Sequence, residues 1–401
     1  MRFANMLGRG FGACGIRLGD LSEETILLQA RRQTGLEDLG EERFRVPLRV
    51  LLGSYENDPR LTFLGRILAQ KMMVHHVANR LKINHDLKQY PEILSGEIHQ
   101  PLFVLGLPRT GTTLLYNLLA QNPDFRPLLF WESMFPSPPP DPEARDSDPR
   151  IRIAEQTVAR LNRAVPKLSA IHEMDPRGPD ECLGLLYNTF VTPFFRGRVA
   201  DYRKWLYGVG DDELKAAYQE YRQQLLLLQW RCSGDHWVLK CPSHLFGLGA
   251  LLRVFPDACV VQTHRDPVKA VPSLCSLSAT LDGLSYQTVD MREVGERTVE
   301  IIDQLVNRSM KARESSNPGR VFDVYYRELV KHPVTTLKQI YAHFGYTYNV
   351  ALEEKLKAYL EVNPQHKHGM HRYSVDDFGL EKETLRDRFS GYCDLFQIRP
   401  E

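Results

Sequence analysis

The sequence contains no hydrophobic run that approaches the length of a membrane-spanning helix. We also expect no secretory signal, because the first residues place Arg2, Arg9 and Arg17 among glycines and lack a continuous apolar stretch. We therefore expect a cytoplasmic protein without a transmembrane segment, in which these residues form a simple tail. The alternative for this tail is a weak interfacial anchor, which would bring peripheral contact with a membrane.

Cysteine pairs at metal-ligand spacing are absent as well. Seven cysteines are scattered through the chain, no Cys-x-x-C occurs, and the count is odd. This usage is typical of reduced thiols in a cytosolic protein rather than of a disulfide framework. An excess of either charge is also lacking, since the formal net charge is +1. The molecule as a whole therefore does not have the composition of a nucleic-acid-binding protein.

By pattern, the chain divides into two parts. The first part is an N-terminal region, 1–97, which is mostly helical in pattern from residue 20 on, with Ser22 as a predicted N-cap. The second part, 98–401, alternates short apolar runs with helical segments. His75 and His76 are adjacent on one predicted helix and face different sides, so we expect a packing or surface role and no chelation. Alternating strands and helices predict an α/β fold, a doubly wound parallel sheet with an N-terminal helical layer.

One stretch combines a strand, a tight loop and a helix. Residues 102–105 are wholly apolar, Gly106 and Gly111 bracket a loop that contains Arg109, and a helical period begins at Thr112. Such a loop turns backbone N–H groups inward at a helix N-terminus and makes an anion site. The residues predicted to line this site are Arg109, Thr110, Gly111, Thr112 and Thr113.

This P-loop-like stretch departs from an ATP-binding loop in two ways. G-x-x-x-x-G-K-[ST] needs a lysine where the chain has Thr112, and neither 237–240 nor 260–263 ends in an acid. An ATP site uses that lysine on the phosphates and an acid to hold Mg²⁺. The loop therefore suits a smaller anionic group without a metal. A P-loop nucleotide kinase is the alternative, and Mg²⁺-dependent ATP binding would favour it.

Several charged or aromatic residues fall at or just after the ends of predicted strands. Residues 126–132, for example, are predicted to form the second strand, which would end at Glu132. In doubly wound sheets, ligands bind at the carboxyl ends of the strands. We therefore expect one shared site that contains Arg109, Glu132, Lys240, Arg265 and Tyr326.

Two motifs in this order resemble those of sulfotransferases that use 3′-phosphoadenosine 5′-phosphosulfate (PAPS). Gly-Leu-Pro-Arg-Thr-Gly-Thr-Thr-Leu-Leu at 106–115 resembles the family's 5′-phosphosulfate loop. The stretch 261–274 resembles its 3′-phosphate site, with Arg265 and Ser273 eight positions apart as the family pattern requires. The likeness runs from about residue 100 to the C-terminus and is strongest to bacterial-type enzymes with an N-terminal helical region. Tyrosylprotein sulfotransferases share the same motif skeleton.

The resemblance implies that PAPS is the sulfuryl donor, that 3′-phosphoadenosine 5′-phosphate (PAP) is the product, and that no metal takes part. Arg109 and Lys240 would then stabilise charge on the sulfate, while a solvated strand-end lysine is the alternative for Lys240. Arg265 and Ser273 would hold the 3′-phosphate. Tyr326 matches a family position near the nucleotide, and a packing role in the sheet is its alternative.

The general base is the least determined part of this site. Glu132 matches the acid that the bacterial and tyrosylprotein branches use as base, whereas other cytosolic sulfotransferases use a histidine. A capping or salt-bridged carboxylate is the structural alternative for Glu132. His172, in a polar loop, is the rival base or a group that orients the acceptor.

The stretch 365–373 holds three histidines in a loop with a glycine, a pattern that could chelate zinc. No cysteine or acid completes a structural zinc site there. By its position, the stretch resembles the basic loop that closes over the 3′-phosphate in sulfotransferases, and Lys367 and His371 would then contact the nucleotide. We prefer this interpretation to a metal site.

No motif identifies the acceptor beyond its hydroxyl group. Aromatic residues crowd the variable segments, which favours a hydrophobic, lipid-like alcohol over a sugar, although core packing explains them equally well. A non-catalytic nucleotide-binding protein on the same fold is a further alternative. The combination of Glu132, Lys240 and Arg265 favours an enzyme over it.

Overall fold

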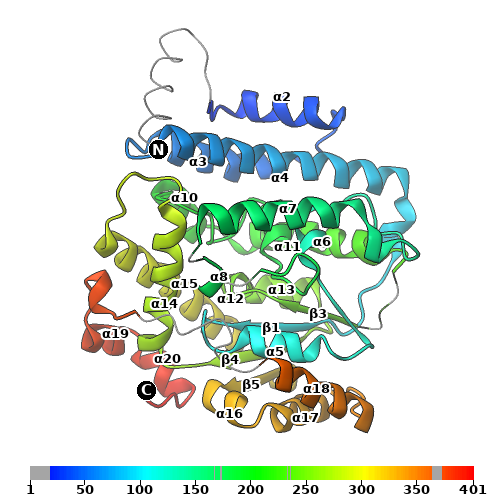
Figure 1. Ribbon diagram of the computed structural model, residues 1–401, viewed down its shortest axis with the longest axis vertical. Coiled ribbons are helices and arrows are strands. Elements are labelled where there is room, and N and C mark those ends of the chain that lie inside the picture. Colours follow the sequence, from blue (N-terminus) through cyan, green and yellow to red (C-terminus); the bar gives the residue numbers. More distant parts are fainter. Residues whose placement is uncertain (1–18, 167, 172–173, 233, 235, 364–372) are drawn as a thin grey trace.

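The computed structural model describes residues 19–166, 168–171, 174–232, 234, 236–363 and 373–401. Its sheet has five parallel strands in the order β2-β3-β1-β4-β5 (Figure 1). This confirms the predicted α/β class and parallel sheet. In chain order the strands are β1 Leu102–Gly106, β2 Phe125–Pro127, β3 His236–Lys240, β4 Cys259–His264 and β5 Val321–Tyr325.

The helices follow the labels of Figure 1. Those before β3 are α2 Glu23–Thr34, α3 Arg45–Glu56, α4 Phe63–Gln89, α5 Thr112–Leu119, α6 Phe130–Met134, α7 Pro149–Ala164, α8 Leu168–Ile171, α9 Leu183–Tyr187, α10 Ala200–Tyr207 and α11 Asp211–Gln229. Those after β3 are α12 Ser243–Phe246, α13 Leu248–Val254, α14 Pro267–Asp282, α15 Met291–Glu314, α16 Tyr326–Lys331, α17 Pro333–Phe344, α18 Val350–Val362, α19 Lys382–Arg388 and α20 Ser390–Leu395.

Both faces of the sheet are buried, which is why β1 is wholly apolar. Leu102 and Val104 point to one face, and Phe103 and Leu105 to the other, because successive side chains of a strand alternate. Helices α5, α16, α17 and α18 cover the first face. Helices α11, α12, α13 and α15 cover the second, and Figure 1 shows the two groups below and above the sheet.

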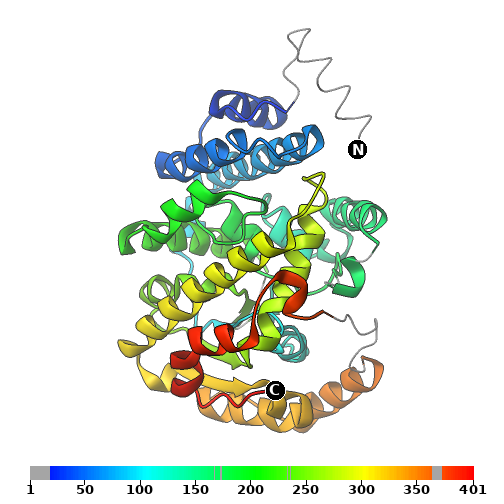
Figure 2. The ribbon, with the colours of Figure 1, turned by 90° about the vertical axis from the view of Figure 1, so that its left-hand side faces the viewer.

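The N-terminal helices α2, α3 and α4 form a layer at the end of the molecule away from α16, α17 and α18 (Figures 1 and 2). Helix α2 begins as predicted, because the Ser22 hydroxyl accepts a hydrogen bond from the amide of Thr25 at 3.3 Å. It ends where Gly35 adopts a left-handed backbone with φ of 71°.

This layer shares its core with the rest of the chain. Leu81 of α4, Leu225 of α11 and Leu239 of β3 are completely buried members of one apolar cluster. The sequence placed a boundary between 1–97 and 98–401, and no break in the buried cluster accompanies it. The division into two domains therefore stays a prediction.

His75 and His76 have packing roles, which is one of the two roles expected of them. The Nε2 atom of His75 lies 3.0 Å from the carbonyl of Met134, at the end of α6. The Nδ1 atom of His76 lies 2.8 Å from the side-chain oxygen of Asn188. The two rings thus join α4 to two different segments of the α/β part.

The segment after β2 differs from the sequence prediction. The strand ends at Pro127, and Glu132 lies in the short helix α6 instead of at the end of a strand. The Oε2 atom of Glu132 accepts the amide hydrogen of Leu129 at 3.1 Å, which stabilises the first turn. A four-residue apolar run is too short for its period to distinguish a helix from a strand.

Candidate active site

The loop between β1 and α5 has the geometry of an anion site at a helix N-terminus. Arg109 and Gly111 both have left-handed backbones, with φ of 70° and 91°. Gly111 also has no room for a side chain, because a Cβ atom there would lie 2.8 Å from Leu329 and 3.3 Å from the ring of Tyr326. The loop is therefore pressed against the start of α16, and α5 begins directly after it at Thr112.

The threonines of this loop differ in what they contact. The hydroxyl of Thr110 is buried, donates to the carbonyl of Leu107 at 2.6 Å, and lies 2.6 Å from the hydroxyl of Thr263 on β4. Thr110 therefore holds the loop against β4. Thr112 is buried at the start of α5 and Thr113 is exposed there. Contact of all three with a phosphosulfate stays a prediction.

Arg265 directly follows β4 and lies against the loop, as the sequence predicted for residues at this edge. Its Nη1 donates to the carbonyl of Arg109 at 3.0 Å. Its guanidinium carbon stands 3.8 Å from the centre of the Tyr326 ring, a stacking arrangement. Its remaining edge binds the carboxylate of Glu401, with Nε and Nη2 each 3.0 Å from Oε2.

Lys240 ends β3 beside β1 and is almost completely buried. Its Nζ donates to Oε1 of Glu181 at 2.6 Å and lies 5.9 Å from the centre of the Tyr116 ring on α5. Burial opposes the charge of Lys240, but the carboxylate of Glu181 outweighs it and raises the pKa of the lysine. Lys240 is therefore a fixed positive charge next to the anion loop.

The segment 178–182, which places Glu181 here, was not among the predicted site residues. The amide of Asp180 donates to the carbonyl of Leu128 at 2.8 Å, and the amide of Cys182 donates to the carbonyl of Lys240 at 3.0 Å. The segment therefore bridges the chain after β2 to the end of β3. Burial and the neighbouring Glu181 carboxylate raise the pKa of Asp180 to about 7. Two adjacent acids after a proline were the only sequence signal.

Glu132 is completely buried and surrounded by hydrogen-bond donors. Its Oε1 accepts from Arg126 at 3.0 Å and from Arg145 at 3.2 Å, in addition to the Leu129 amide on Oε2. Arg126 is itself buried and lies over the ring of Trp237. This is the salt-bridged environment that the sequence left open for Glu132. Its role as a base remains a proposal.

Among the described residues, Ser273 is the predicted site residue for which no contact with this cluster is seen. Ser273 is buried in α14, two turns beyond Arg265. His172, Lys367 and His371 lie outside the described residues. Their predicted roles, including the closing of 365–373 over a nucleotide, stay predictions.

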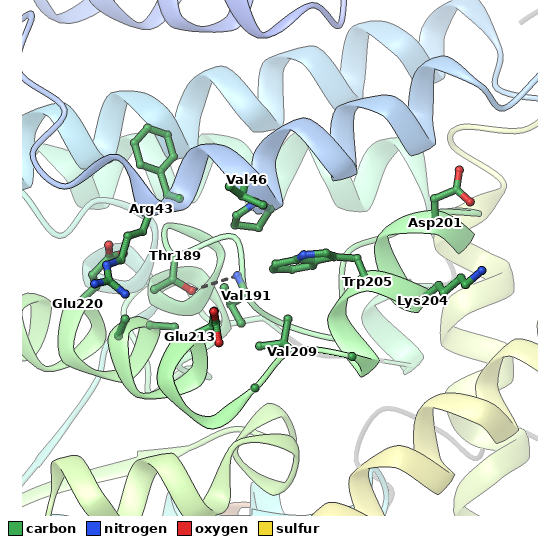
Figure 3. Close-up of a pocket in the computed structure, with 16 residues that line it drawn as sticks. Arg43, Val46, Thr189, Val191, Asp201, Lys204, Trp205, Val209, Glu213 and Glu220 are labelled. Carbon is green, nitrogen blue, oxygen red and sulfur yellow. Dashed lines mark hydrogen bonds between the residues drawn. The ribbon is translucent and has the colours of Figure 1, made fainter.

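A cavity of about 700 Å³ lies elsewhere, between α3, α10 and α11. Figure 3 shows the ring of Trp205 and the side chain of Val46 facing it, with charged groups at its margin. Among the described residues, its lining includes none of those predicted for the anion site. Thr189 and Val191 line the cavity, and the hydroxyl of the nearby Thr192 lies 2.9 Å from the hydroxyl of Ser243 on α12.

Within the described ranges, no cluster of three or more histidine, cysteine or acidic side chains is arranged to hold a metal ion. No helix in that part of the chain is both long and apolar enough to cross a bilayer. The six described cysteines are unpaired, and Cys182 and Cys241 are buried close to Lys240.

The fold is that of an α/β protein of the P-loop-like class, and the loop at the carboxyl edge of its sheet has the geometry expected of an anion site. The chain belongs to the sulfotransferase family, whose model matches residues 101–349.

Solved sulfotransferases share both this fold and the N-terminal layer. Sulfotransferase STF9 from Mycobacterium avium superposes with a TM-score of 0.86 and 29% identity, covering 95% of this chain and 98% of its own. Sulfotransferase STF1 from Mycobacterium tuberculosis H37Rv superposes with a TM-score of 0.82 and 30% identity, covering 92% and 98%. Because at least 92% of this chain is covered, each superposition extends into the layer formed by α2, α3 and α4.

Curated relatives are more distant in sequence. Omega-hydroxy-beta-dihydromenaquinone-9 sulfotransferase Stf3 of Mycobacterium bovis is 26% identical over 310 residues, which are 73% of this chain and 75% of that protein. Protein-tyrosine sulfotransferase 1 of Danio rerio is 22% identical over 256 residues, 63% of this chain and 54% of that protein. The chain is therefore an enzyme of the sulfuryl-transferring class.

Proposed function

We propose that this enzyme transfers the sulfuryl group of PAPS to a hydroxyl acceptor and releases PAP. The observation that carries the proposal is the contact between two predicted phosphate sites. Arg265 donates to the backbone of the loop at Arg109, so one nucleotide could place a phosphate on each. The family membership supports the same chemistry.

The transfer is an in-line displacement at sulfur, in which the acceptor oxygen attacks and the phosphate of PAP leaves. Negative charge develops on the sulfuryl and leaving oxygens, and fixed positive charges stabilise it. Arg109 is exposed on the loop and Lys240 is buried beside it. We assign both to this role, with no metal in the reaction.

The acceptor must lose its proton, and a carboxylate near Lys240 is suited to take it. The sequence proposed Glu132, but this carboxylate is completely buried, and two arginines and one amide already engage its oxygens. Glu181 is 21% exposed and pairs with Lys240. When the sulfuryl group attracts Lys240, Glu181 loses its counter-ion and becomes more basic. We therefore favour Glu181 and keep Glu132 and His172, the two bases that the sequence suggested, as alternatives.

We further propose a hydrophobic alcohol as the acceptor. Support comes from the relative Stf3, whose name gives a hydroxylated dihydromenaquinone as its acceptor. The unpaired cysteines of the described chain support a reducing, cytoplasmic setting. Peripheral contact with a membrane would bring such an acceptor within reach.

Calorimetry with PAP, ATP and ADP, each with and without EDTA, tests the sulfuryl donor. PAP should bind without metal, and EDTA should leave its affinity unchanged. Arg265→Ala should weaken PAP by about tenfold or more, because a charge-assisted phosphate contact contributes about 1.5–3 kcal/mol. Binding of ATP that requires Mg²⁺ would instead favour a kinase, and no binding of any nucleotide would contradict the proposal.

A further inference from the structure

The anionic group that already occupies Arg265 is a residue of the chain itself. Two nitrogens of one guanidinium edge lie 3.0 Å from the same carboxylate oxygen of Glu401. The third nitrogen donates a hydrogen bond to the carbonyl of Arg109, and the flat face of the guanidinium stacks on the ring of Tyr326. A paired N–H edge is what a guanidinium offers to a phosphate. That edge holds a carboxylate in this structure.

The chain before Glu401 is docked beside β4. The ring of Phe396 stacks on the imidazole of His264, the last residue of that strand, with centres 4.3 Å apart. The hydroxyl of Tyr392 lies 2.9 Å from Nδ1 of the same imidazole. Figure 1 shows α20, to which Tyr392 belongs, next to the ends of β4 and β5.

Backbone contacts then hold the residue in place. The amide of Glu401 donates to Oδ2 of Asp266 at 3.0 Å, and Arg327 donates to the carbonyl of Pro400 at 2.8 Å. The side chain of Glu401 is 15% exposed and that of Arg265 is 18% exposed. The pair is therefore largely shielded from water, where an ion pair is stronger than at an open surface.

We propose that Glu401 is a built-in competitor of the sulfuryl donor, holding the arginine until the 3′-phosphate displaces it. This rests on the proposed function, which assigns the 3′-phosphate to Arg265. One guanidinium edge cannot hold both anions, so a nucleotide that carries a 3′-phosphate must displace Glu401, and with it the segment 396–401, before it binds fully. The apparent dissociation constant is then the intrinsic one divided by the fraction of molecules in which Glu401 is undocked.

If Glu401 instead positioned Arg265 for the nucleotide, removing its charge would weaken PAP binding. One substitution therefore distinguishes a positioning role from competition. Glu401→Gln keeps the shape and removes the charge. In calorimetry, PAP should bind this variant about threefold to tenfold more tightly than the unaltered protein. Binding of 5′-AMP, which lacks the 3′-phosphate, should not change. Glu383→Gln on α19 removes the same charge from an exposed position and should change neither.

Unchanged or weaker binding of PAP to Glu401→Gln would contradict the proposal that Glu401 competes with the sulfuryl donor. A separate experiment tests the assignment of the 3′-phosphate to Arg265. The unaltered protein should bind PAP more tightly than 5′-AMP, and Arg265→Ala should abolish that difference. If the two nucleotides bind alike from the start, the 3′-phosphate assignment itself fails. Hydrogen exchange gives a direct readout, because PAP should speed exchange in a peptide covering 396–401. A peptide that stays protected in the complex contradicts displacement.

Discussion

At the scale of single residues, the proposed chemistry depends on the ion pair between Lys240 and Glu181. A buried ammonium needs a counter-ion, and the carboxylate 2.6 Å away provides it. The incoming sulfuryl donor is a second anion for the same lysine. Exchange of one counter-ion for the other would couple binding of the donor to the basicity of the carboxylate.

The first kinetic prediction concerns this carboxylate. Glu181→Gln should lower kcat by about 10²–10⁴-fold, the usual contribution of a general base, while PAP affinity falls much less. The substitution should also lower the pKa of Lys240, since Glu181 is what raises it. Steady-state kinetics with calorimetry on the same preparations measures both. Near-normal kcat in this variant would exclude Glu181 as the base.

The matched variant Glu132→Gln should behave differently. It leaves Arg126 and Arg145 without their shared carboxylate, and breaking a buried pair costs about 3–5 kcal/mol of unfolding free energy. We expect a clear fall in Tm with kcat retained in the folded fraction. A normal Tm together with lost turnover would instead identify Glu132 as the general base. His172→Ala is the third variant to compare. Loss of turnover in this variant, with Glu181→Gln and Glu132→Gln still active, would identify the imidazole of His172 as the base.

The sequence predicted Lys240, Arg109 and Arg265 at this edge, because each follows a short apolar strand. It could not predict the partners that these charges have. Glu181 comes from a loop 59 residues before Lys240, and no local pattern records that approach. Glu132 was placed at a strand end because its apolar neighbours are too few to have a readable period.

At the scale of elements, helix α4 is joined to the α/β part through two neutral histidines. Burial lowers the pKa of His75 to about 4, and burial with the neighbouring His75 lowers the pKa of His76 to about 3. Both rings make hydrogen bonds across the interface, to Met134 and Asn188. The interface therefore depends on their remaining uncharged.

Acid should weaken this junction, because the two histidines bind protons more readily in the unfolded chain than in the folded chain. The unfolded chain protonates its histidines near pH 6.5, while the folded chain resists protonation down to about 4 or 3. Folding stability should therefore fall as pH decreases from 6.5 to 4, by several kcal/mol at about 1.4 kcal/mol per pKa unit. Urea unfolding at a series of pH values measures the slope.

His76→Gln keeps a side-chain donor for Asn188 and removes the titration, so its stability should depend less on pH in this window. His99→Gln is the control, since His99 is exposed. Equal pH slopes in all three proteins would show that these buried rings do not set acid stability.

At the scale of the whole molecule, the N-terminal layer shares one buried cluster with the α/β part. Leu81, Leu225 and Leu239 belong to the same buried cluster, although they come from different layers. Removing residues 1–97 would expose a wide apolar surface of α11 and its neighbours to water. Sequence patterns could separate helical from alternating segments, but they could not show that the two parts pack as one.

We expect a single cooperative unfolding transition for the full chain, with calorimetric and van't Hoff enthalpies in agreement. A chain of 98–401 alone should be insoluble or lack a cooperative transition. Scanning calorimetry of both proteins is the measurement. Two separate transitions in the full chain, or a stably folded 98–401, would show that the two parts are independent domains.

The hydrogen bond from Arg265 to the carbonyl of Arg109 has a wider consequence. Under the proposed function it ties the rigid turn around one end of the nucleotide to the cation at the other end. The energies of the two phosphate contacts would then not add, because a ligand with a single phosphate would order only half of a connected unit. Selectivity for a doubly phosphorylated nucleotide would arise from this connection as well as from the count of charges.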